Sequence, residues 1–448
     1  MREAAIAVFR GVRRERTVPA HVYETAGTII LNVSATVLNF AGILLLSRLL
    51  GASGYGEYAL AIAWASVLSV VAVLGLTPLV VRRVAEYHQA RKLGLLRGLL
   101  RRTNEAVVLA SVLTMVAAGV VSWLIYRGQP ELLYPIWIAT LLVPLIALTS
   151  LRQAAMQGLG KVLLGRIPET LAAPALLILF AAVAWATLEH FTASWATVAQ
   201  VAATFIAFCT GAVLLRRTLP AATSRTTTEY DMSSWRRSGV PLLLLNLVMA
   251  ANQRLGTILL GALGTAAMAG VFNVAERATA FISFVMLAAT YPLMPRVARL
   301  HASGDLTGLN RLVVLTARGV LLFALPTGLV LIVFGPQILH LFGEDFGGGA
   351  TAIRILAIGE VANVLTGYGG LVLVMTGFEK DLTRCAALGA ALNLGLSAVL
   401  IPSFDVPGAA VATATGVTFS NILMMWLAWR RLRIWTGVLS IGRLRPRT

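Results

Sequence analysis

Four charged residues, Arg254, Glu276, Arg277 and Glu360, lie inside long apolar stretches of this sequence. A charge near the centre of a lipid bilayer costs about 2.5 to 3.5 kcal/mol on insertion scales, so such a residue usually faces a wet cavity or a partner. At 1.5 Å per helical residue, all four lie about 12 to 15 Å from the same end of their segments. This spacing predicts one polar chamber in the second half of the chain.

The residue types suggest what that chamber binds. A guanidinium group offers a fork of N–H donors that holds a phosphate through two parallel hydrogen bonds, which makes Arg254 and Arg277 candidate substrate-binding residues for a diphosphate. Glu276 and Glu360 are candidates for binding a coupling proton or sodium ion, or for balancing the arginine charge. The alternative is an Arg–Glu pair that only ties helices together.

Polar side chains elsewhere in the apolar stretches extend the set of candidate substrate-binding residues. Asn32 and Asn39 lie in the first stretch, and Asn252 and Asn273 lie close to the two arginines in the sequence. An amide hydrogen-bonds sugar hydroxyls or a neighbouring helix, and the second role is the more common one in membranes. Arg48 completes the set, although its place near a segment end also suits a side chain that reaches back to the lipid headgroups.

The composition indicates an integral membrane protein. Of the 448 residues, 58% are hydrophobic and only 12% are charged, and the mean hydropathy is +0.82. A helix needs roughly 20 apolar residues to cross a hydrocarbon core of about 30 Å. The sequence predicts an all-α fold with twelve transmembrane helices, at 25–48, 58–81, 104–126, 133–151, 170–188, 195–215, 239–262, 267–293, 312–334, 350–375, 385–402 and 407–429.

Basic residues give the predicted orientation. Most of the 37 Lys and Arg residues fall in alternate connectors, which the positive-inside rule assigns to the cytoplasm. Both termini are therefore predicted to be cytoplasmic. Because the net charge of +18 resides in these connectors, we do not expect nucleic-acid binding.

The twelve segments divide into two sets of six. The expected units are a cytoplasmic N-terminal segment 1–24, a first six-helix bundle 25–215, a cytoplasmic linker 216–238, a second bundle 239–429 and a basic cytoplasmic tail 430–448. The residues from Gly56 resemble those from Gly270, and Gly158 matches Gly377 at a similar offset. Six crossings return the chain to its starting side, so the bundles would be parallel repeats. The alternative is chance, because small residues recur in membrane helices anyway.

The sequence contains no motif for a nucleotide, a metal or a disulfide framework. It has no Gly-x-x-x-x-Gly-Lys-Ser/Thr loop and no His-Glu-x-x-His pair, and its two cysteines are far apart. The outer connectors are short, so no external domain is expected to house a catalytic cleft. We therefore expect a secondary transporter rather than an enzyme, with no cofactor and with a proton or sodium gradient as the candidate driving force.

Several short motifs resemble the landmarks of a known family. The stretch LSRLLGASGYGEY at 46–58 is similar to the first-helix signature of polysaccharide biosynthesis proteins, the Wzx-type flippases. Similar motifs follow in the family's order along nearly the whole chain: GLTP at 75–78, RRVAE at 82–86, PRVARL at 295–300, LFGEDF at 341–346, LIP at 400–402 and GAAVAT at 408–413.

The resemblance implies the multidrug/oligosaccharidyl-lipid/polysaccharide exporter fold, in which two six-helix bundles form a V around a central cavity. It also implies a flippase that moves an undecaprenyl-diphosphate-linked oligosaccharide from the inner to the outer leaflet of the bacterial plasma membrane by alternating access, for surface polysaccharide synthesis. The implied partners are the lipid-linked oligosaccharide, the bilayer, a polysaccharide polymerase and glycosyltransferases.

Two other functions stay open at this point. One is a cation-coupled drug exporter of the same superfamily, and the other is an integral membrane enzyme that transfers glycans. The chain also departs from the family pattern at Gln253, which stands where many relatives carry an acidic residue. This departure weakens the case for ion coupling at that position.

Overall fold

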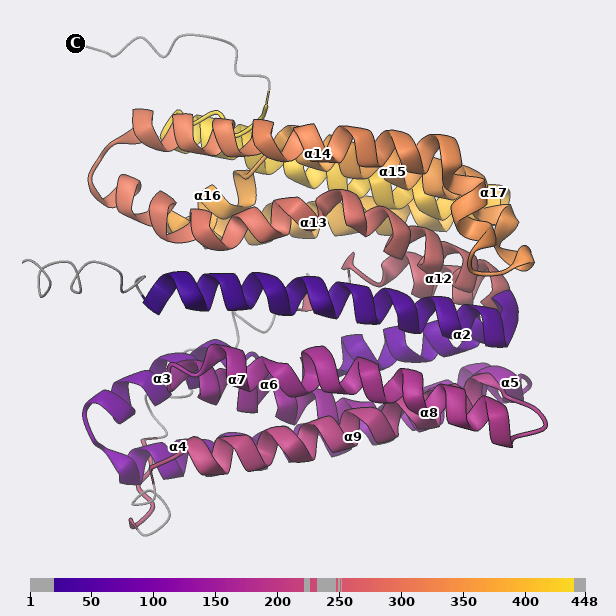
Figure 1. The fold of residues 1–448 in the computed structure, drawn as a ribbon, viewed down its shortest axis with the longest axis horizontal. Helices are drawn as coiled ribbons and strands as arrows, with labels where there is room; N and C mark the ends of the chain where they lie inside the picture. The colour runs from indigo at the N-terminus through magenta and orange to yellow at the C-terminus, as the bar shows by residue number, and fades with distance from the viewer. Residues whose placement is uncertain (1–19, 221–225, 232–246, 249, 251, 439–448) are drawn as a thin grey trace, which may run out of the picture.

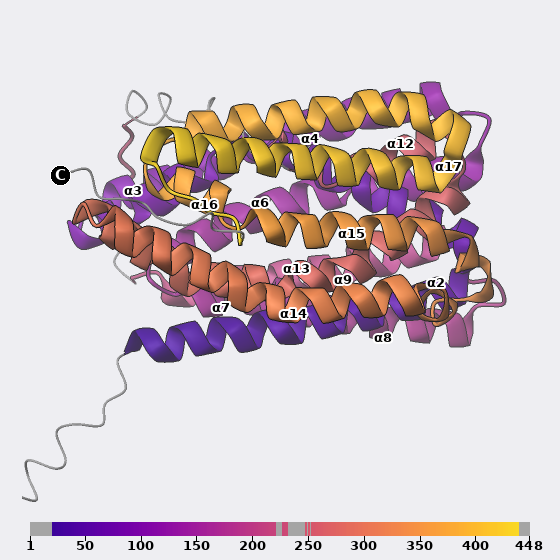
Figure 2. The same cartoon turned by 90° about the horizontal axis from the view of Figure 1, so that it is seen from above.

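The chain forms a bundle of long helices that run side by side (Figures 1 and 2). The computed structural model describes residues 20–438 apart from 221–225, 232–246, 249 and 251, so the predicted segments 1–24 and 430–448 lie partly outside the described residues. The described elements are α2 (Ala20–Val73), α3 (Thr77–Gln89), α4 (Leu93–Tyr126), α5 (Pro130–Thr140), α6 (Leu142–Gly158), α7 (Val162–Ile167), the π-helix η1 (Pro168–Ala172), α8 (Ala173–Thr187), α9 (Ala193–Thr218), α12 (Leu255–Leu263), α13 (Ala266–Ala302), α14 (Leu306–His340), the 3-10 helix η3 (Glu344–Gly349), α15 (Ala350–Thr366), α16 (Gly369–Met375) and α17 (Glu379–Leu432).

Two of these helices, α2 and α17, each turn back at one residue with positive φ. The residue is Gly51 in α2, with φ +66°, and Asp405 in α17, with φ +49°. Glycine adopts positive φ without a steric penalty, whereas residues with a Cβ seldom do. Each of the two elements is therefore a pair of helices joined by a tight turn (Figures 1 and 2).

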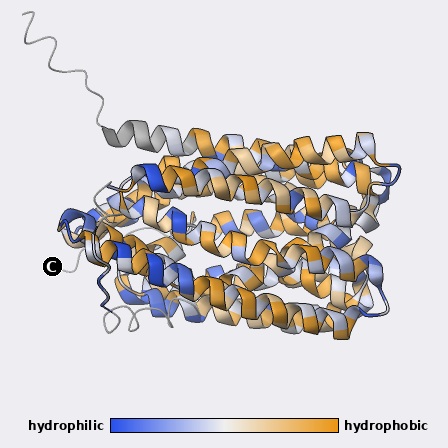
Figure 3. Cartoon of the chain, turned by 90° about the horizontal axis from the view of Figure 1, so that it is seen from below, coloured by the Kyte–Doolittle hydropathy of each residue, from blue (hydrophilic) through white to orange (hydrophobic). Residues whose placement is uncertain are grey.

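The described residues contain nine helical stretches that are long and apolar enough to cross a membrane. Because α2 and α17 each supply two crossings, the nine stretches account for eleven of the twelve predicted spans. The remaining span, 239–262, falls partly on residues outside the described ranges, and α12 is its described end. Apolar residues predominate along the helices and hydrophilic residues gather at both ends (Figure 3). The predicted all-α membrane fold is confirmed.

Several helices are longer than their predicted spans. α4 begins at Leu93 rather than at 104, and α13 continues to Ala302 rather than ending at 293. Their ends carry basic residues such as Arg97 and Arg299, which shorten the apolar stretch without breaking the helix. The predicted span 58–81 was wrong for a different reason: the chain leaves helical geometry at Leu74 and Gly75, which both have positive φ, before α3 begins.

The buried side chains show how the first bundle (α2–α9) and the second bundle (α12–α17) meet. We call the end where α2 begins and α17 ends the terminal end, and the end where Gly51 and Asp405 reverse the chain the turn end. One apolar cluster joins both bundles near the turn end, and it includes Tyr55, Phe272 and Phe346. Near the terminal end each bundle has a core of its own. The two bundles thus form a V that opens at the terminal end.

A pair of glycines brings the bundles into backbone contact. A Cβ on Gly56 in α2 would meet the carbonyl oxygen of Ala266, and a Cβ on Gly270 in α13 would meet the carbonyl oxygen of Ala52. Ala52 precedes Gly56 by one helical turn, just as Ala266 precedes Gly270. The contact is therefore reciprocal, as expected between two repeats related by a two-fold axis, and it involves the glycines that the sequence comparison pairs.

The second pair of matched motifs aligns differently in the structure. Gly160 after α6 and Gly377 after α16 both have positive φ, +73° and +85°. In each case the following residue donates its N–H to a carbonyl five residues back, Lys161 to Met156 at 2.9 Å and Phe378 to Leu373 at 2.8 Å. This is the glycine-terminated helix end. Gly160, not Gly158, is therefore the structural counterpart of Gly377.

The predicted linker 216–238 lies partly outside the described residues, but its described part packs on the first bundle. Glu229 donates its N–H to the carbonyl of Gly94 at 3.1 Å, at the start of α4. At the other end of the chain, Val438 donates its backbone N–H to the carbonyl of Leu365. The backbone N–H of Trp435 donates to the side-chain oxygen of Asn310. The first part of the predicted tail is therefore folded onto the second bundle.

Candidate functional site

A central cavity of about 780 Å³ lies between the two bundles. Its first-bundle wall comes from α2, α7, η1, α8 and α9, and its second-bundle wall comes from Arg254 and α13. The cavity extends from Tyr55, in the core shared near the turn end, toward Asn32 and Leu287, which lie closer to the terminal end of their helices. It therefore occupies the space that the V leaves open.

Three guanidinium groups line this cavity. Arg254 precedes α12, Arg277 lies in the fourth turn of α13, and Arg166 lies in α7 of the opposite bundle. Within the described part of the chain, the side chains of Arg254 and Arg277 form no hydrogen bond or ion pair. Arg166 donates to the Asn32 side-chain oxygen at 3.2 Å. No Asp or Glu is among the described lining residues, so the cavity wall itself is positively charged. The Glu276 carboxylate, next to Arg277 in the sequence but not on the wall, interacts electrostatically with both Arg254 and Arg277 and offsets part of this charge.

Neutral polar groups complete the cavity wall. The Tyr55 hydroxyl donates to the Asn273 side-chain oxygen at 3.0 Å, and the Tyr58 hydroxyl donates to Gln200 at 2.9 Å. Asn39 donates to the carbonyl of Ala35, one turn earlier in α2. These contacts hold the amides in place while leaving hydrogen-bonding capacity for sugar hydroxyls, because each amide has both donor and acceptor sites.

The structure does not place all four predicted intramembrane charges in one chamber. Arg254 and Arg277 line the cavity, whereas Glu276 and Glu360 are not among its described lining residues. Glu360 belongs to a polar cluster between α13, α15 and α17: it accepts hydrogen bonds from Ser283 and from Asn363, and Asn363 in turn accepts one from Asn421. Since Ser283 lines the cavity, one side chain separates Glu360 from it.

Two further predicted positions, Arg48 and Asn252, lie away from the cavity. Arg48 is exposed and donates to the carbonyl of Leu341 at 2.6 Å, which ties α2 to the end of α14. Arg354 makes the same kind of contact with the carbonyl of Ile332 at 3.1 Å. Asn252 is not among the described lining residues, and its side-chain oxygen is buried without a hydrogen-bond partner among the described residues. Arg48 and Asn252 are therefore not on the wall of the cavity that Arg254 and Arg277 line.

Two charged residues between the predicted spans 133–151 and 170–188 lie inside the first bundle. Arg152 in α6 is 4% exposed and pairs with Glu169 in η1, which also accepts a hydrogen bond from Gln153. The guanidinium fits because Gly211 of α9 has no side chain there. Arg166 was missed for the same reason as this pair, since all three residues fell in the predicted connector between the fourth and fifth spans. The i, i+4 spacing of Arg166, Thr170 and Pro174, all on the cavity wall, was the available signal.

The described residues hold no cluster of three or more His, Cys, Asp or Glu side chains that could bind a metal ion. The chemistry available at the site is therefore that of guanidinium, amide and hydroxyl groups. Guanidinium, amide and hydroxyl groups together can hydrogen-bond an anion that carries hydroxyl groups.

Comparison with known proteins identifies the family. A family model described as polysaccharide biosynthesis protein matches residues 24–301, more than half of the chain. The chain belongs to the polysaccharide biosynthesis protein family. A second model, described as MatE, matches residues 241–399 of the chain.

Curated and solved relatives agree with that assignment. The probable flippase AglR of Haloferax volcanii is 28% identical over 217 residues, which cover 47% of this chain and 44% of AglR, so the match spans less than half of either protein. An inward-facing multidrug resistance transporter of the MATE family has a TM-score of 0.74 at 14% identity and covers 90% of this chain and 98% of its own. The lipid II flippase MurJ has a TM-score of 0.69 at 12% identity and covers 89% and 87%. The two solved structures therefore share the fold of this chain, and the curated relative is named as a probable flippase.

Proposed function

We propose that the protein flips a polyprenyl-diphosphate-linked oligosaccharide across the membrane, with the undecaprenyl carrier that the family resemblance implies. The observation that carries this proposal is the set of three guanidinium groups, Arg166, Arg254 and Arg277, around a cavity whose described lining contains no carboxylate. A diphosphate supplies the negative charge that such a site lacks, and guanidinium forks bind phosphate oxygens in pairs.

The wall of the cavity also suits the sugar that a diphosphate would carry. Asn39 and Gln200 line it together with the Tyr58 hydroxyl. A volume of about 780 Å³ falls within the usual range of ligand sites, which is about 300 to 1,000 Å³. The polyprenyl chain is too apolar and too long for this space, so we propose that it stays in the bilayer between the bundles.

The direction of transport follows from the predicted orientation. If the terminal end is cytoplasmic, as the positive-inside rule predicts, then the V is open to the inner leaflet and closed by the Gly56–Gly270 contact on the outer side. The headgroup enters from the cytoplasmic side, and rocking of the two bundles exposes it to the other side. This is alternating access between two conformations of one site.

Glu360 is the better candidate for coupling to a proton or sodium ion. Its carboxylate accepts hydrogen bonds from Ser283 and Asn363 and has no basic partner among the described residues. A bound proton or cation would neutralise this partly buried carboxylate inside the membrane. Because Ser283 touches both Glu360 and the cavity, the occupancy of one site affects the other.

A drug exporter of organic cations is disfavoured by the same charges. A cation would have to enter a cavity that holds three guanidinium groups, and like charges in a low dielectric repel strongly. A glycan-transferring enzyme would need a nucleophile or a general base beside the guanidinium groups, and the described lining offers none of the usual acidic ones.

The test uses charge removal inside and outside the cavity. Arg254→Ala and Arg277→Ala should each lower flipping of a fluorescent lipid diphosphate sugar in proteoliposomes by about tenfold or more, since a hydrogen bond to a charged group is worth about 1.5 to 3 kcal/mol. Arg→Lys should give intermediate rates, because an ammonium lacks the bidentate fork. Arg354→Gln, which removes an arginine bound to a backbone carbonyl away from the cavity, is the matched control. Wild-type rates in both alanine variants would refute the proposal.

A further inference from the structure

A second, smaller hollow lies in the first bundle, separate from the central cavity. Its floor is α6, and its walls are α4 and α9, which both pack against α6. The groove holds about 330 Å³, and none of its lining residues lines the central cavity. It is therefore a candidate site of its own.

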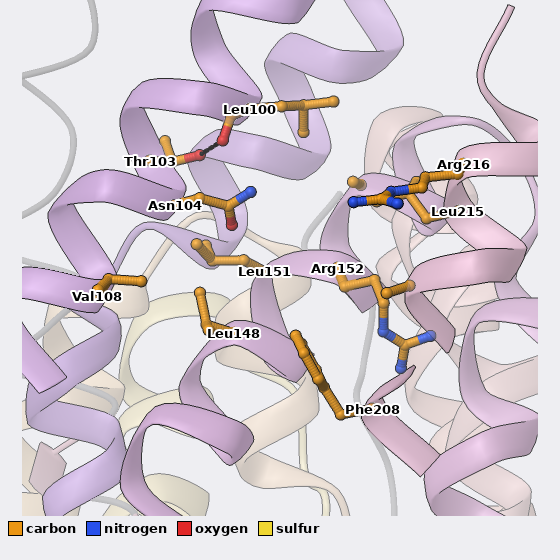
Figure 4. A pocket seen from close by; sticks show the side chains of 12 residues that line it. Leu100, Thr103, Asn104, Val108, Leu148, Leu151, Arg152, Phe208, Leu215 and Arg216 are labelled. Atoms are coloured by element: carbon orange, nitrogen blue, oxygen red, sulfur yellow. Dashed lines mark hydrogen bonds between the residues drawn. The ribbon is translucent and has the colours of Figure 1, made fainter. Parts of the chain in front are cut away.

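The groove changes character along its length. Arg216, in the last turn of α9, and Asn104, on α4, lie at its terminal end, and the Arg216 guanidinium is directed toward the α4 wall (Figure 4). Phe208 lies two turns of α9, or about 12 Å, deeper in the membrane, and Val108 and Leu148 line the groove with it. A polar mouth at the headgroup level thus leads into an apolar slot at the level of the acyl chains.

The positive charge at the mouth is uncompensated. Within the described residues the Arg216 guanidinium group forms no hydrogen bond and no ion pair. Arg152 on the floor behaves differently, because its guanidinium points away from Asn104 and Arg216 and is paired with Glu169 (Figure 4). The net charge that faces the mouth of the groove is therefore that of Arg216.

We propose that this groove binds one anionic glycerophospholipid from the leaflet at the terminal end. Its phosphate is held by Arg216 and Asn104, and one acyl chain lies along Phe208, Val108 and Leu148. Basic pockets between transmembrane helices bind anionic headgroups in this way, and each nearby Lys or Arg contributes about 1 kcal/mol. Charge complementarity selects the anionic lipid, and the depth of the apolar slot selects a lipid over a soluble phosphate.

The site has a short route to the transport cavity. Arg152, whose side chain lines the groove, is paired with Glu169, and the next residue, Thr170, lines the central cavity. A lipid that orders the α6–α9 contact would therefore also order η1, which stands between the two sites.

The test is lipid binding by the purified full-length protein, measured by native mass spectrometry with added phosphatidylglycerol or phosphatidylcholine. The wild type should retain one phosphatidylglycerol in preference to phosphatidylcholine. Arg216→Gln should weaken phosphatidylglycerol binding about fivefold, which corresponds to the loss of one basic contact. The matched control is Arg217→Gln, at the neighbouring basic residue that does not line the groove, and it should bind as the wild type does.

Two further arms distinguish a lipid seated in the slot from a soluble phosphate bound at the mouth. Ala212→Phe fills the apolar slot beside Phe208 without changing the charge, and it should remove the retained lipid while Arg216 is intact. Soluble glycerol 1-phosphate should not compete, because it lacks the acyl chain. Equal retention of both phospholipids, equal weakening by the Arg216 and Arg217 variants, an unaffected Ala212→Phe variant, or competition by glycerol 1-phosphate would each overturn the proposal.

Discussion

A single methyl group at the Gly56–Gly270 contact should open the turn end of the protein. A Cβ on Gly270 would lie 2.5 Å from the carbonyl oxygen of Ala52, and 2.9 and 3.0 Å from the N and Cα atoms of Gly56. A close carbon–oxygen contact measures roughly 3.3 Å, so the overlap with that oxygen is about 0.8 Å. All of these neighbours are backbone atoms, so no side-chain rotation relieves the overlap and α2 must move away from α13.

The size of the effect follows from the energetics of overpacking. Extra methyl groups in tightly packed sites cost about 1 to 3 kcal/mol. This cost falls on the conformation closed at the turn end and not on a conformation in which the two helices have separated. The ratio of closed to open protein should therefore fall by about 5- to 150-fold, because each 1.4 kcal/mol changes an equilibrium tenfold. Gly56→Ala and Gly270→Ala together should cost less than the sum, since the first substitution has already separated the backbones.

The populations can be measured with spin labels on opposite bundles at the turn end. Tyr134 in α5 and Phe404 in α17 are both exposed, and Cys209 and Cys385 would be replaced first. The long-distance population should increase in Gly56→Ala and in Gly270→Ala. Gly319→Ala is the control, because a Cβ there meets no atom within 4 Å. Distance distributions that match the wild type in both variants would show that this contact does not hold the bundles together.

Three other predictions concern stability and the C-terminal segment. Arg152→Leu leaves the Glu169 carboxylate without its cationic partner, which typically costs about 3 to 5 kcal/mol, so the melting temperature in detergent should fall. The double variant Arg152→Leu with Glu169→Leu should regain most of the lost stability. Tyr55→Phe removes the hydroxyl that donates to the Asn273 side chain, and it should lower stability by about 1 kcal/mol in the same assay. Gly367→Ala puts a Cβ at φ +72° against the carbonyl of Thr436, so proteolysis beyond residue 432 should become faster; cleavage at the wild-type rate would contradict it.

The long apolar helices and the two cavity arginines were predictable because each produces a pattern that can be recognised along the sequence alone. A stretch of about 20 apolar residues marks a crossing, and an arginine inside such a stretch marks a wet interior. Arg254 and Arg277 fulfilled both conditions, and the structure places them in one cavity. The turn at Gly51 was likewise signalled by a glycine followed by a second apolar stretch.

The features that were missed depend on contacts between residues far apart or on different helices, which a hydropathy profile does not report. Arg152 and Glu169 lowered the apolar score and were read as a connector, yet the two charges neutralise each other inside the first bundle. Glu360 was misplaced because depth along a helix says nothing about rotation. It lies on the side of α15 that meets Ser283 of α13, and this contact is visible only once the two helices are packed.

The distribution of charge also explains how binding of an anion can drive the proposed transport cycle. Arg254 and Arg277 belong to the second bundle and Arg166 to the first, so basic side chains line both walls of the V. In the proposed cycle, a diphosphate would contact guanidinium groups from both bundles and attract the two walls toward each other, so it would stabilise the conformation closed at the terminal end. The glycine contact at the turn end must then open, and an increase in the Tyr134–Phe404 label distance upon substrate binding would report it.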